Sequence, residues 1–508
     1  MAIIGEIIKK AVELSHTIID NPDPVSAQEK VLEELLDKAK NTAFGKKYNF
    51  RDILAEGYRT QSFARSVPYF DYNRIYKEWW KDVYDGKSDI TWPGSPGFFA
   101  LSSGTTSRSK SIPVTDDILV NIRNAGIKQF LAMAEFDMAP SFFEKEILML
   151  GSSTNLEKVG EHLEGEISGI SAYNIPFWFK LFYKPGPEIS AIENWDERVL
   201  EIAKKAPEWD IGGLSGIPSW IELMLKKVVE YNKVNNIHEI WPNLEVYTSG
   251  GISFEPFKKS FRKILGREII VLDTYLASEG YLATQLRKDT GSMTLLTDNG
   301  IYFEFVPLKP ENIDDNGLIK DGIQSLTIGE VEEDVDYILV ISTVSGAWRY
   351  MIGDTIRFTD KERVEIEITG RTKYFLNVVG SQLSEIQMIK ALEKLGADQN
   401  LDIKEFTVCA IKKGDDYIHR WYLGSMDEPE TDNKRLAGEL DNNLKEINKN
   451  YNKTRTKALK DVEAIVVPVN YFYDWAEHRK KKGGQTKVPK VMKEDEFRDW
   501  ESFIARYK

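Results

Sequence analysis

The stretch Leu101–Lys110 contains six hydroxyl side chains, one glycine and two cations within ten residues. It follows the apolar residues 98–101, so we expect it to form a turn directly after a strand. Main-chain amides and hydroxyls in such a turn make a concave set of donors that suits phosphate oxygens. Arg108 and Lys110 would add positive charge. Because Ser, Thr and Gly also dominate ordinary turns, this stretch alone leaves phosphate binding and a solvated turn both open.

Several other chemistries lack support in the sequence. The standard nucleotide loop Gly-x-x-x-x-Gly-Lys-Ser/Thr is absent here, and so is a Gly-x-Ser-x-Gly elbow. The chain has five histidines, His16, His162, His238, His419 and His478. Their spacing fits no metal site, which leaves a zinc hydrolase unsupported. The single cysteine, Cys409, excludes an intramolecular disulfide framework and fits a reducing cytosol.

The elements that must position the opening loop alternate between strand and helix from about residue 98 to residue 274. Short apolar runs at 146–150, 211–214, 244–247 and 268–272 are separated by helical patterns at 196–205, 219–234 and 255–265. Strand and helix in succession predict a largely parallel, doubly wound sheet.

The pattern then changes to one typical of antiparallel strands. Asp298-Asn-Gly300 lies between apolar runs at 294–296 and 301–305, which predicts a hairpin. Residues 337–341 and the segment from 350 onward form a second hairpin-like pair, with Asp354 expected in its turn. We therefore expect the second half of the large domain to be antiparallel.

A compact series of helices and strands follows residues 369–373. Helices are expected at 384–395 and 433–448, with strands at 406–411, 417–423 and 464–467. The fold class is thus α/β, with a large doubly wound mixed-sheet domain that includes an antiparallel, hairpin-rich region, and a small α+β domain. We place the large domain at 1–370 and the small domain at 371–508.

Composition limits the possible partners. The 508 residues have 42% hydrophobic content, enough for an ordinary globular protein, and a net charge of -13 that disfavours nucleic acid. Residues 1–20 have helical spacing without a signal-peptide pattern, and we expect this helix to pack on its own domain rather than on a membrane surface. No apolar run reaches membrane-spanning length. We expect a cytoplasmic monomer that binds neither membrane nor nucleic acid.

Three segments together change the interpretation of the opening loop. They are Ser102-Ser-Gly-Thr-Thr-Ser-Arg-Ser-Lys110, Thr274-Tyr-Leu-Ala-Ser-Glu279 and Tyr350-Met-Ile-Gly-Asp354, and they resemble the signature motifs of the acyl-adenylate-forming superfamily. With Gly216–Trp220, Ser249-Gly-Gly251 and Gly483–Pro489 in order, the chain more narrowly resembles the Gretchen Hagen three family of acyl acid amido synthetases. The resemblance covers nearly the whole chain.

The resemblance implies a large ATP-binding domain and a small mobile C-terminal lid. It assigns Tyr275 to adenine, Glu279 to catalysis and to Mg²⁺, and Asp354 and Arg371 to the ribose. Lys110 and Lys487 would be catalytic, Lys487 by neutralising the α-phosphate, and Lys373 would be the hinge. The remaining nucleotide-binding residues implied are Ser102, Ser103, Gly104, Thr105, Thr106, Gly250, Gly251 and Ser278. The superfamily usually has glycine where Leu276 stands here.

Each assignment has a plainer alternative. Tyr275 could be a core aromatic, Glu279 a surface carboxylate, and Asp354 part of a common Gly-Asp turn. Arg371 and Lys373 could belong to a charged linker. Lys487 follows the basic run 479–482, which could instead be a solvated or anion-binding patch.

The resemblance implies an ATP- and Mg²⁺-dependent ligase that adenylates a small carboxylic acid and transfers the acyl group to an amino acid. An acyl-CoA ligase would share the adenylation residues, and a nucleotide-binding protein without catalysis would share the pocket. Aromatic residues at 173–179, with Ser219 and Trp220, are candidate walls of the acyl pocket. The sequence does not identify the acid.

Overall fold

The computed structural model describes residues 9–10, 23–102, 110–177, 179–251, 254–288, 290–314, 317–372, 383, 385–413, 416–426, 432–448, 451–452, 455, 459–478 and 488–507. Backbone contacts divide the chain into two compact units. The first comprises Met1–Pro307, Asp321–Ile352 and Arg357–Glu367, and the second comprises Leu308–Lys320, Gly353–Ile356 and Ile368–Lys508. The expected domain limits at 370 and 371 stay a prediction.

A parallel sheet forms one half of the large mixed sheet in the first unit. Its strands, in spatial order, are β6 (Tyr183–Lys184), β3 (Glu146–Leu150), β7 (Ile211–Gly216), β8 (Val246–Gly250) and β9 (Ile270–Ala277). The crossovers between these strands contain helices, as parallel connections require. The predicted parallel sheet is therefore confirmed.

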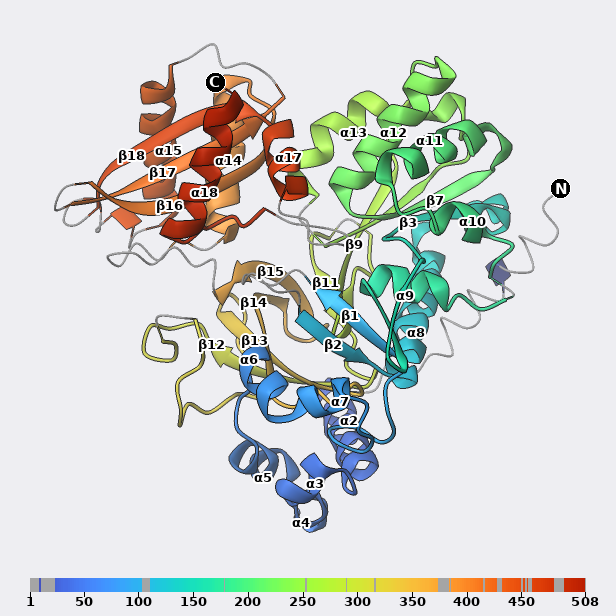
Figure 1. The fold of residues 1–508 in the computed structure, drawn as a ribbon, viewed down its shortest axis with the longest axis vertical. Helices are drawn as coiled ribbons and strands as arrows, with labels where there is room; N and C mark the ends of the chain where they lie inside the picture. Colours follow the sequence, from blue (N-terminus) through green and yellow to red (C-terminus); the bar gives the residue numbers. More distant parts are fainter. Residues whose placement is uncertain are drawn as a thin grey trace. The chain divides into compact units, whose positions relative to one another are not determined.

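Three helices pack on this sheet through one apolar cluster: α11 (Trp195–Lys205), α12 (Pro218–Asn232) and α13 (Lys258–Ile264). Figure 1 shows them together beside β7 and β3. On α12, Ile221, Leu225 and Val228 are fully buried at the spacing of one helix face. The helix begins with proline at its first position and ends before Lys233, which has a left-handed backbone.

The other half of the large sheet continues from β9 in the order β10, β11, β15, β14, β13, β12. These strands are β10 (Gly280–Thr284), β11 (Met293–Leu295), β12 (Ile301–Pro307), β13 (Asp336–Thr343), β14 (Tyr350–Asp360) and β15 (Glu365–Arg371). The pairs β9–β10, β10–β11, β11–β15 and β12–β13 are antiparallel. The expected antiparallel half is confirmed, and β13 neighbours β14 as predicted.

The hairpin expected around Asp298-Asn-Gly300 is wrong, because β11 and β12 are not neighbours. A buried side chain from α2 (Pro24–Ala39) binds the backbone there instead. The Gln28 amide donates to the Thr297 and Ile301 carbonyls at 2.7 and 2.8 Å, and its oxygen accepts from the Phe303 amide at 2.7 Å. These bonds replace part of the ladder that a local hairpin would have formed.

Asp354 was expected in the turn of a hairpin, but it lies inside β14. The connection from β13 to β14 is made by residues 344–349, where Gly346 has a φ of 76°. A Cβ on Gly346 would lie 2.4 Å from the Thr91 hydroxyl, so only glycine fits this turn. The Gly353-Asp354 pair, although common in turns, therefore belongs to the strand.

A second sheet of the first unit carries the start of the opening loop. Its order is β2 (Lys110–Val114), β1 (Phe98–Ser102), β5 (His162–Gly165) and β4 (Glu157–Val159). Helix α8 (Asp116–Ala132) follows β2, and its first turn is capped by the Thr115 hydroxyl.

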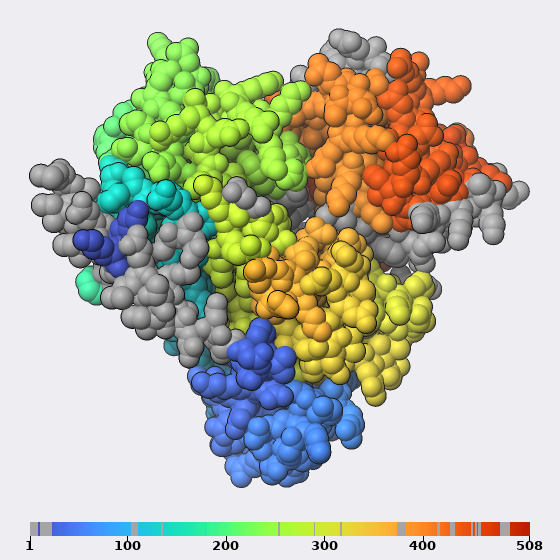
Figure 2. All heavy atoms as spheres, turned by 180° about the vertical axis from the view of Figure 1, so that it is seen from behind, coloured from blue at the N-terminus to red at the C-terminus, as the bar shows by residue number. Residues whose placement is uncertain are grey.

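Short helices make up the amino-terminal part of the described chain. After α2 come α3 (Ala43–Lys47), α4 (Phe50–Ala55), α5 (Arg59–Ser66), α6 (Tyr72–Ile75), the π-helical turn η1 (Tyr76–Trp80) and α7 (Lys81–Tyr84). Figure 2 shows these blue segments next to yellow segments of the chain. The Gln28 bonds to the backbone at 297–303 account for this contact.

The second unit contains a three-stranded sheet of order β16 (Ile403–Lys413), β17 (Asp416–Ser425) and β18 (Leu459–Pro468). Its helices include α14 (Glu385–Gln399), α15 (Asn433–Ile447), α17 (Asn470–His478) and α18 (Glu494–Ile504). One apolar cluster joins the sheet to α14 and α15, and a second joins it to α17 and α18. The expected small α+β fold is confirmed. Cys409 is buried in the second cluster, and burial raises its thiol pKa to about 12.

Candidate functional site

The carboxyl ends of β7, β8 and β9 lie at one edge of the parallel sheet, which is where α/β sheets bind ligands. Gly250 and Gly251 end β8 at this edge. A Cβ on Gly250 would lie 2.6 Å from the Thr274 hydroxyl, which donates to the Ser249 carbonyl at 2.9 Å. Gly251 has a φ of 84° and is exposed. Only glycine allows the chain to pass β9 this closely and then turn.

Three residues far apart in the sequence meet in the first unit at one buried hydroxyl. Tyr350 is fully buried at the start of β14. The Lys110 ammonium lies 3.5 Å from the Tyr350 hydroxyl, within hydrogen-bond distance. The Glu279 carboxylate is near enough for its charge to act on the same hydroxyl. Burial and the Glu279 charge raise the pKa of Tyr350 well above its ordinary value, so it stays a neutral donor. Glu279 is buried as well, with 5% exposure.

Two aromatic residues hold this group in place. The Tyr72 ring lies 5.3 Å from the Lys110 ammonium, and the Tyr72 hydroxyl accepts from the Ser111 amide at 2.8 Å. Burial raises the pKa of Tyr72 to about 12. The Trp80 ring lies 5.5 Å from the Tyr350 ring. Lys110 is therefore fixed by an aromatic face and a neutral hydroxyl, both of which suit an ammonium that must stay charged.

The opening loop is closed at its base by the two strands that flank it. Ser102 and Lys110 are opposite each other in the antiparallel β1–β2 pair. Ser103, Gly104, Thr105 and Thr106 lie outside the described residues, as do Lys373 and Lys487. For these six predicted site residues the structure gives no position.

The predicted adenine segment is a buried strand end. Tyr275 has 6% exposure, and Ser278 is half-buried directly before Glu279. Leu276, where the superfamily usually has glycine, packs against a cluster that contains Ala125 on α8 and Tyr281 on β10. Its side chain thus joins β9 to α8, which explains why a larger residue is accommodated here.

Sequence reasoning missed Asp273, which lies opposite Ser249 in the β8–β9 register. Burial, with the nearby Glu255 carboxylate, raises the Asp273 pKa to about 6, while the nearby Lys258 charge opposes the shift. Its position could have been noticed, because an acid directly follows the predicted strand 268–272. Tyr350 was quoted in a motif but assigned no role, since a sequence gives no sign that its ring would be buried between two charges.

In the second unit, Asp354 and Arg371 form an ion pair with each other. The Arg371 Nε lies 2.9 Å from an Asp354 carboxylate oxygen, and the Asp354 side chain is 7% exposed against 42% for Arg371. Gly353, with a φ of 93°, precedes the aspartate, and its carbonyl accepts from the Thr372 hydroxyl at 3.4 Å. Arg371 is thus the last residue of β15 rather than part of a free linker.

The candidate acyl-pocket residues divide into two groups. Tyr173 and Phe177 are exposed, by 53% and 84%, so they are not core aromatics. Trp220 packs on the apolar cluster of α11 and α12, with its ring 4.3 Å from Trp195. Trp178 lies outside the described residues.

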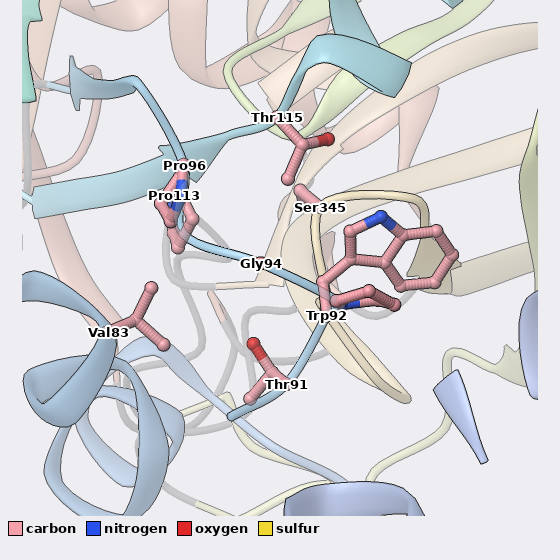
Figure 3. Close-up of a pocket in the computed structure, with 9 residues that line it drawn as sticks. Val83, Thr91, Trp92, Gly94, Pro96, Pro113, Thr115 and Ser345 are labelled. Atoms are coloured by element: carbon pink, nitrogen blue, oxygen red, sulfur yellow. The ribbon is translucent and has the colours of Figure 1, made fainter. Parts of the chain in front are cut away.

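Three further features of the described chain carry no chemistry. Within the described residues, no group of three His, Cys, Asp or Glu side chains could hold a metal ion by itself. A small hollow, partly open to solvent, lies between Trp92 on one side and Pro96 and Pro113 on the other (Figure 3). Its lining contains no titratable side chain, which makes it unsuitable for a charged substrate. No described helix has both the length and the apolar character needed to cross a membrane.

Comparison with known protein families shows to which family this chain belongs. The chain matches the GH3 family N-terminal domain over residues 20–182, the GH3 family central domain over 294–371 and the GH3 family C-terminal domain over 386–496. The chain belongs to the GH3 family. Lys110 lies in the N-terminal match, Tyr350 in the central match, and Glu279 in the stretch between these two matches.

Curated GH3 relatives are similar over part of their length. The chain is 27% identical over 208 residues to the indole-3-acetic acid-amido synthetase GH3.2 of Arabidopsis thaliana, covering 38% of this chain and 37% of that protein. It is 27% identical over 183 residues to the jasmonoyl–L-amino acid synthetase JAR4 of Nicotiana attenuata, covering 34% and 30%. These matches span about a third of the length of each relative.

Solved structures of this fold extend the likeness to nearly the whole chain. The GH3.15 acyl acid amido synthetase superposes with a TM-score of 0.77 at 16% identity, covering 97% of this chain and 95% of that one. A 2-hydroxyisobutyryl-CoA ligase superposes with a TM-score of 0.58 at 12% identity, covering 96% and 93%. Because the sequence identity is low, these structures establish only the fold of this GH3 protein.

Proposed function

We propose that this protein is an ATP-dependent ligase that adenylates a small carboxylic acid and transfers the acyl group to the amine of an amino acid. The observation that carries the proposal is the meeting of Lys110, Tyr350 and Glu279 at one buried hydroxyl, from three separate motifs. Membership of a family whose curated members are amido synthetases supports the same reaction.

The reaction has two balanced steps. A carboxylate oxygen of the acid forms a bond to the α-phosphorus of ATP while the bond to the leaving pyrophosphate breaks. The amine nitrogen of the acceptor then attacks the acyl carbonyl, AMP leaves, and the amine releases a proton. Both steps move negative charge between oxygens, so fixed cations and amide donors supply most of the catalysis.

Lys110 is the described residue best placed to bind phosphate oxygens. Its ammonium carries positive charge beside the base of the Ser102–Lys110 loop, and the Tyr72 ring and the Tyr350 hydroxyl fix its position. The exposed Gly251 backbone at the end of β8 presents amide and carbonyl groups at the same edge of the sheet as Tyr275. We assign adenine to Tyr275 and the surrounding nucleotide contacts to Ser102, Ser103, Gly104, Thr105, Thr106, Gly250, Gly251 and Ser278.

The residues present fit a magnesium ion held mainly by nucleotide phosphates. Mg²⁺ prefers carboxylate and phosphate oxygens and usually takes only one or two ligands from the protein. Glu279 supplies one buried carboxylate, and no described trio of ligands competes with it. When bound, the ion would neutralise charge on the phosphates, and the protein's part is to orient the Glu279 carboxylate.

Four residues complete the proposed assignments. We assign Asp354 to the ribose hydroxyls, because a carboxylate accepts two hydrogen bonds well, with Arg371 beside it at 2.9 Å. Lys487 would serve adenylation and Lys373 the hinge, with a large domain at 1–370 and a lid at 371–508. We further propose that the protein acts as a cytoplasmic monomer on small molecules, without nucleic acid or membrane.

Exchange of labelled pyrophosphate into ATP tests the first step. The proposal expects exchange that depends on an added carboxylic acid, and no exchange with any member of a broad acid panel would refute it. Indole-3-acetic and jasmonic acids belong in that panel, because the names of two relatives contain these acyl groups. Glu279→Ala should abolish exchange without unfolding the protein. Unchanged exchange would remove Glu279 from the mechanism.

Mass spectrometry of the products separates the possible acceptors. With amino acids and coenzyme A both present, the proposal expects an amide. Thioester alone would favour the acyl-CoA ligase alternative, to which the fold of the 2-hydroxyisobutyryl-CoA ligase gives some weight. Lys487→Ala should slow exchange far more than it slows the reaction of supplied acyl-adenylate with amine. Equal slowing would exclude a role confined to adenylation.

A further inference from the structure

One buried cation of the first unit lacks a partner among the described residues. Arg198 lies on α11 with 6% exposure, and its Nε is completely buried without a hydrogen bond. No hydrogen bond or ion pair joins its guanidinium to any other residue in the described part of the chain. Burial lowers the pKa of Arg198, while the Tyr183 hydroxyl and the Glu166 carboxylate oppose that shift without pairing with it.

A cation in this state is costly to keep inside a protein. A buried charge normally pairs with an opposite charge or with several hydrogen-bond acceptors, because its desolvation is otherwise not offset. The Trp195 ring, 5.4 Å from the guanidinium, gives Arg198 one favourable contact but no lone pair for its N–H donors. The ligand that matches those planar donors is a carboxylate, which accepts two of them side by side.

The contacts of Arg198 lead to a candidate wall of the acyl pocket. The Trp195 ring lies 4.3 Å from the ring of Trp220. Trp220 lies in the first turn of α12, directly after the carboxyl end of β7, the edge at which such sheets bind ligands. The unpartnered cation is therefore one aromatic ring behind that wall.

A second polar group without a partner lies on the helix that ends in the other candidate wall. This helix, α9 (Ile167–Tyr173), directly follows Glu166, whose charge acts on Arg198. Its Ser171 hydroxyl is buried and has no hydrogen-bond partner among the described residues. Two buried polar groups near the candidate walls thus lack partners, which is unusual for buried polar atoms and points to a polar ligand.

We propose that Arg198 binds a carboxylate at the inner end of the acyl pocket, so that the preferred acid carries a second negative group besides the one that is adenylated. The inference rests on the proposed function and names the class of its acid substrate. The adenylated carboxylate has to reach the α-phosphorus of ATP, so the group that pairs with Arg198 is the other one.

Paired substrates test this proposal. Dicarboxylic acids from succinate to azelate are compared with their monomethyl esters in pyrophosphate exchange, because each ester has only one carboxylate, which ATP must receive. For at least one chain length the diacid should have a kcat/KM at least about 10-fold above that of its ester, the effect of one charge-assisted hydrogen bond. Arg198→Met should abolish this preference. Esters that match their diacids at every length in the natural protein would overturn the proposal.

The matched control is Arg74→Met. Arg74 also lies over a ring, 4.9 Å from that of Phe70, but it is exposed and pairs with Glu78 at 3.1 Å. This variant should keep the preference for the diacid. A loss of the preference in both variants would show that it does not depend on Arg198, and would overturn the proposal.

Thermal unfolding separates a binding residue from a structural one. Without ligand, Arg198→Met removes a desolvated charge, so its midpoint should equal or exceed that of the natural protein. A lower midpoint would show that the guanidinium stabilises the fold, and would overturn the proposal. At least one diacid of the series should raise the midpoint of the natural protein but not that of Arg198→Met. Exchange with no acid at all would refute the proposed function, whereas these midpoints would still test Arg198.

Discussion

The stability of the second unit should depend on pH through one buried histidine. His419, on the central strand β17, is fully buried, and neither ring nitrogen has a hydrogen-bond partner among the described residues. Burial, with the nearby Arg455 charge, lowers the His419 pKa from 6.5 to about 3, against an opposing effect of Asp441. The folded unit therefore requires a neutral imidazole.

The sign and size of the effect follow from proton linkage. The unfolded chain binds a proton at His419 below pH 6.5, whereas the folded unit does so only near pH 3. Stability is therefore fully present above pH 6.5 and is lost as the pH falls toward 3. At about 1.4 kcal/mol for each pH unit, the loss is about 2 kcal/mol at pH 5.

The neighbours of His419 do not titrate in the same window. Its ring lies 5.9 Å from Tyr451, whose hydroxyl donates to Asp441 at 2.7 Å. Arg455 binds the same carboxylate at 2.7 Å, and hydrogen bonds from Arg455 and others lower the Asp441 pKa against its burial. The Asp441 contribution is thus present above its unfolded pKa of 3.8 and disappears only at lower pH.

Hydrogen exchange of the β17 and β18 amides measures this locally. Between about pH 7 and about pH 5 the free energy of opening should fall by about 2 kcal/mol in the natural protein and stay level in His419→Gln. His238→Gln is the control, because His238 lies in the first unit and its pKa is also lowered by burial. An equal pH dependence in the natural protein and His419→Gln would refute the reasoning.

Two further predictions concern the first unit. Gln28→Leu removes three hydrogen bonds to the backbone at 297–303 and leaves those buried groups unsatisfied, so urea unfolding should show a loss of about 3 kcal/mol or more. A loss below about 1 kcal/mol would show that the strand rearranges. Gly250→Ala places a Cβ 2.6 Å from the Thr274 hydroxyl, so pyrophosphate exchange should fall at least about 10-fold while the protein stays folded. Unchanged exchange would mean that the backbone at Gly250 does not shape the site.

Local sequence patterns predicted most of the strands, because a buried strand consists mainly of apolar residues. The apolar run 146–150 coincides with β3, and the expected helix 433–448 differs from α15 by one residue. Runs of this kind can pack in few ways, so a continuous apolar segment between helices indicates a buried parallel strand.

The errors occurred where distant residues decide the backbone. Asn299-Gly300 favours a hairpin locally, but Gln28, about 270 positions earlier, takes the carbonyl groups that flank the turn. Gly353-Asp354 favours a turn locally, but the tight approach of Thr91 to Gly346 places the turn earlier. Gln28 and Thr91 both lie too far along the chain for a pattern of neighbouring residues to reveal their effect.

The site was predictable by residue type but not by arrangement. Lys110 and Glu279 have the charges that phosphate and magnesium require, and their motifs are visible in the sequence. Their proximity to Tyr350 is a tertiary arrangement, because Lys110 lies on β2 of the smaller sheet whereas Tyr350 and Glu279 belong to separate parts of the large sheet. The same holds for the Asp354–Arg371 pair, formed between residues of β14 and β15.

Arg349, directly before β14, shows how a structural ion pair can serve a site. Arg349 has a left-handed backbone, with a φ of 40°, which is strained for a residue with a side chain. Its buried guanidinium offsets that strain by binding Glu304 at 3.0 Å and the carbonyls of Ala64 and Val67 at 2.6 and 2.7 Å. This conformation fixes where the strand begins, and therefore where the next residue, Tyr350, places its hydroxyl. The charges of Arg349 and Glu304 neutralise each other within the fold. We infer that this ion pair stabilises the backbone that places the Tyr350 hydroxyl beside Lys110.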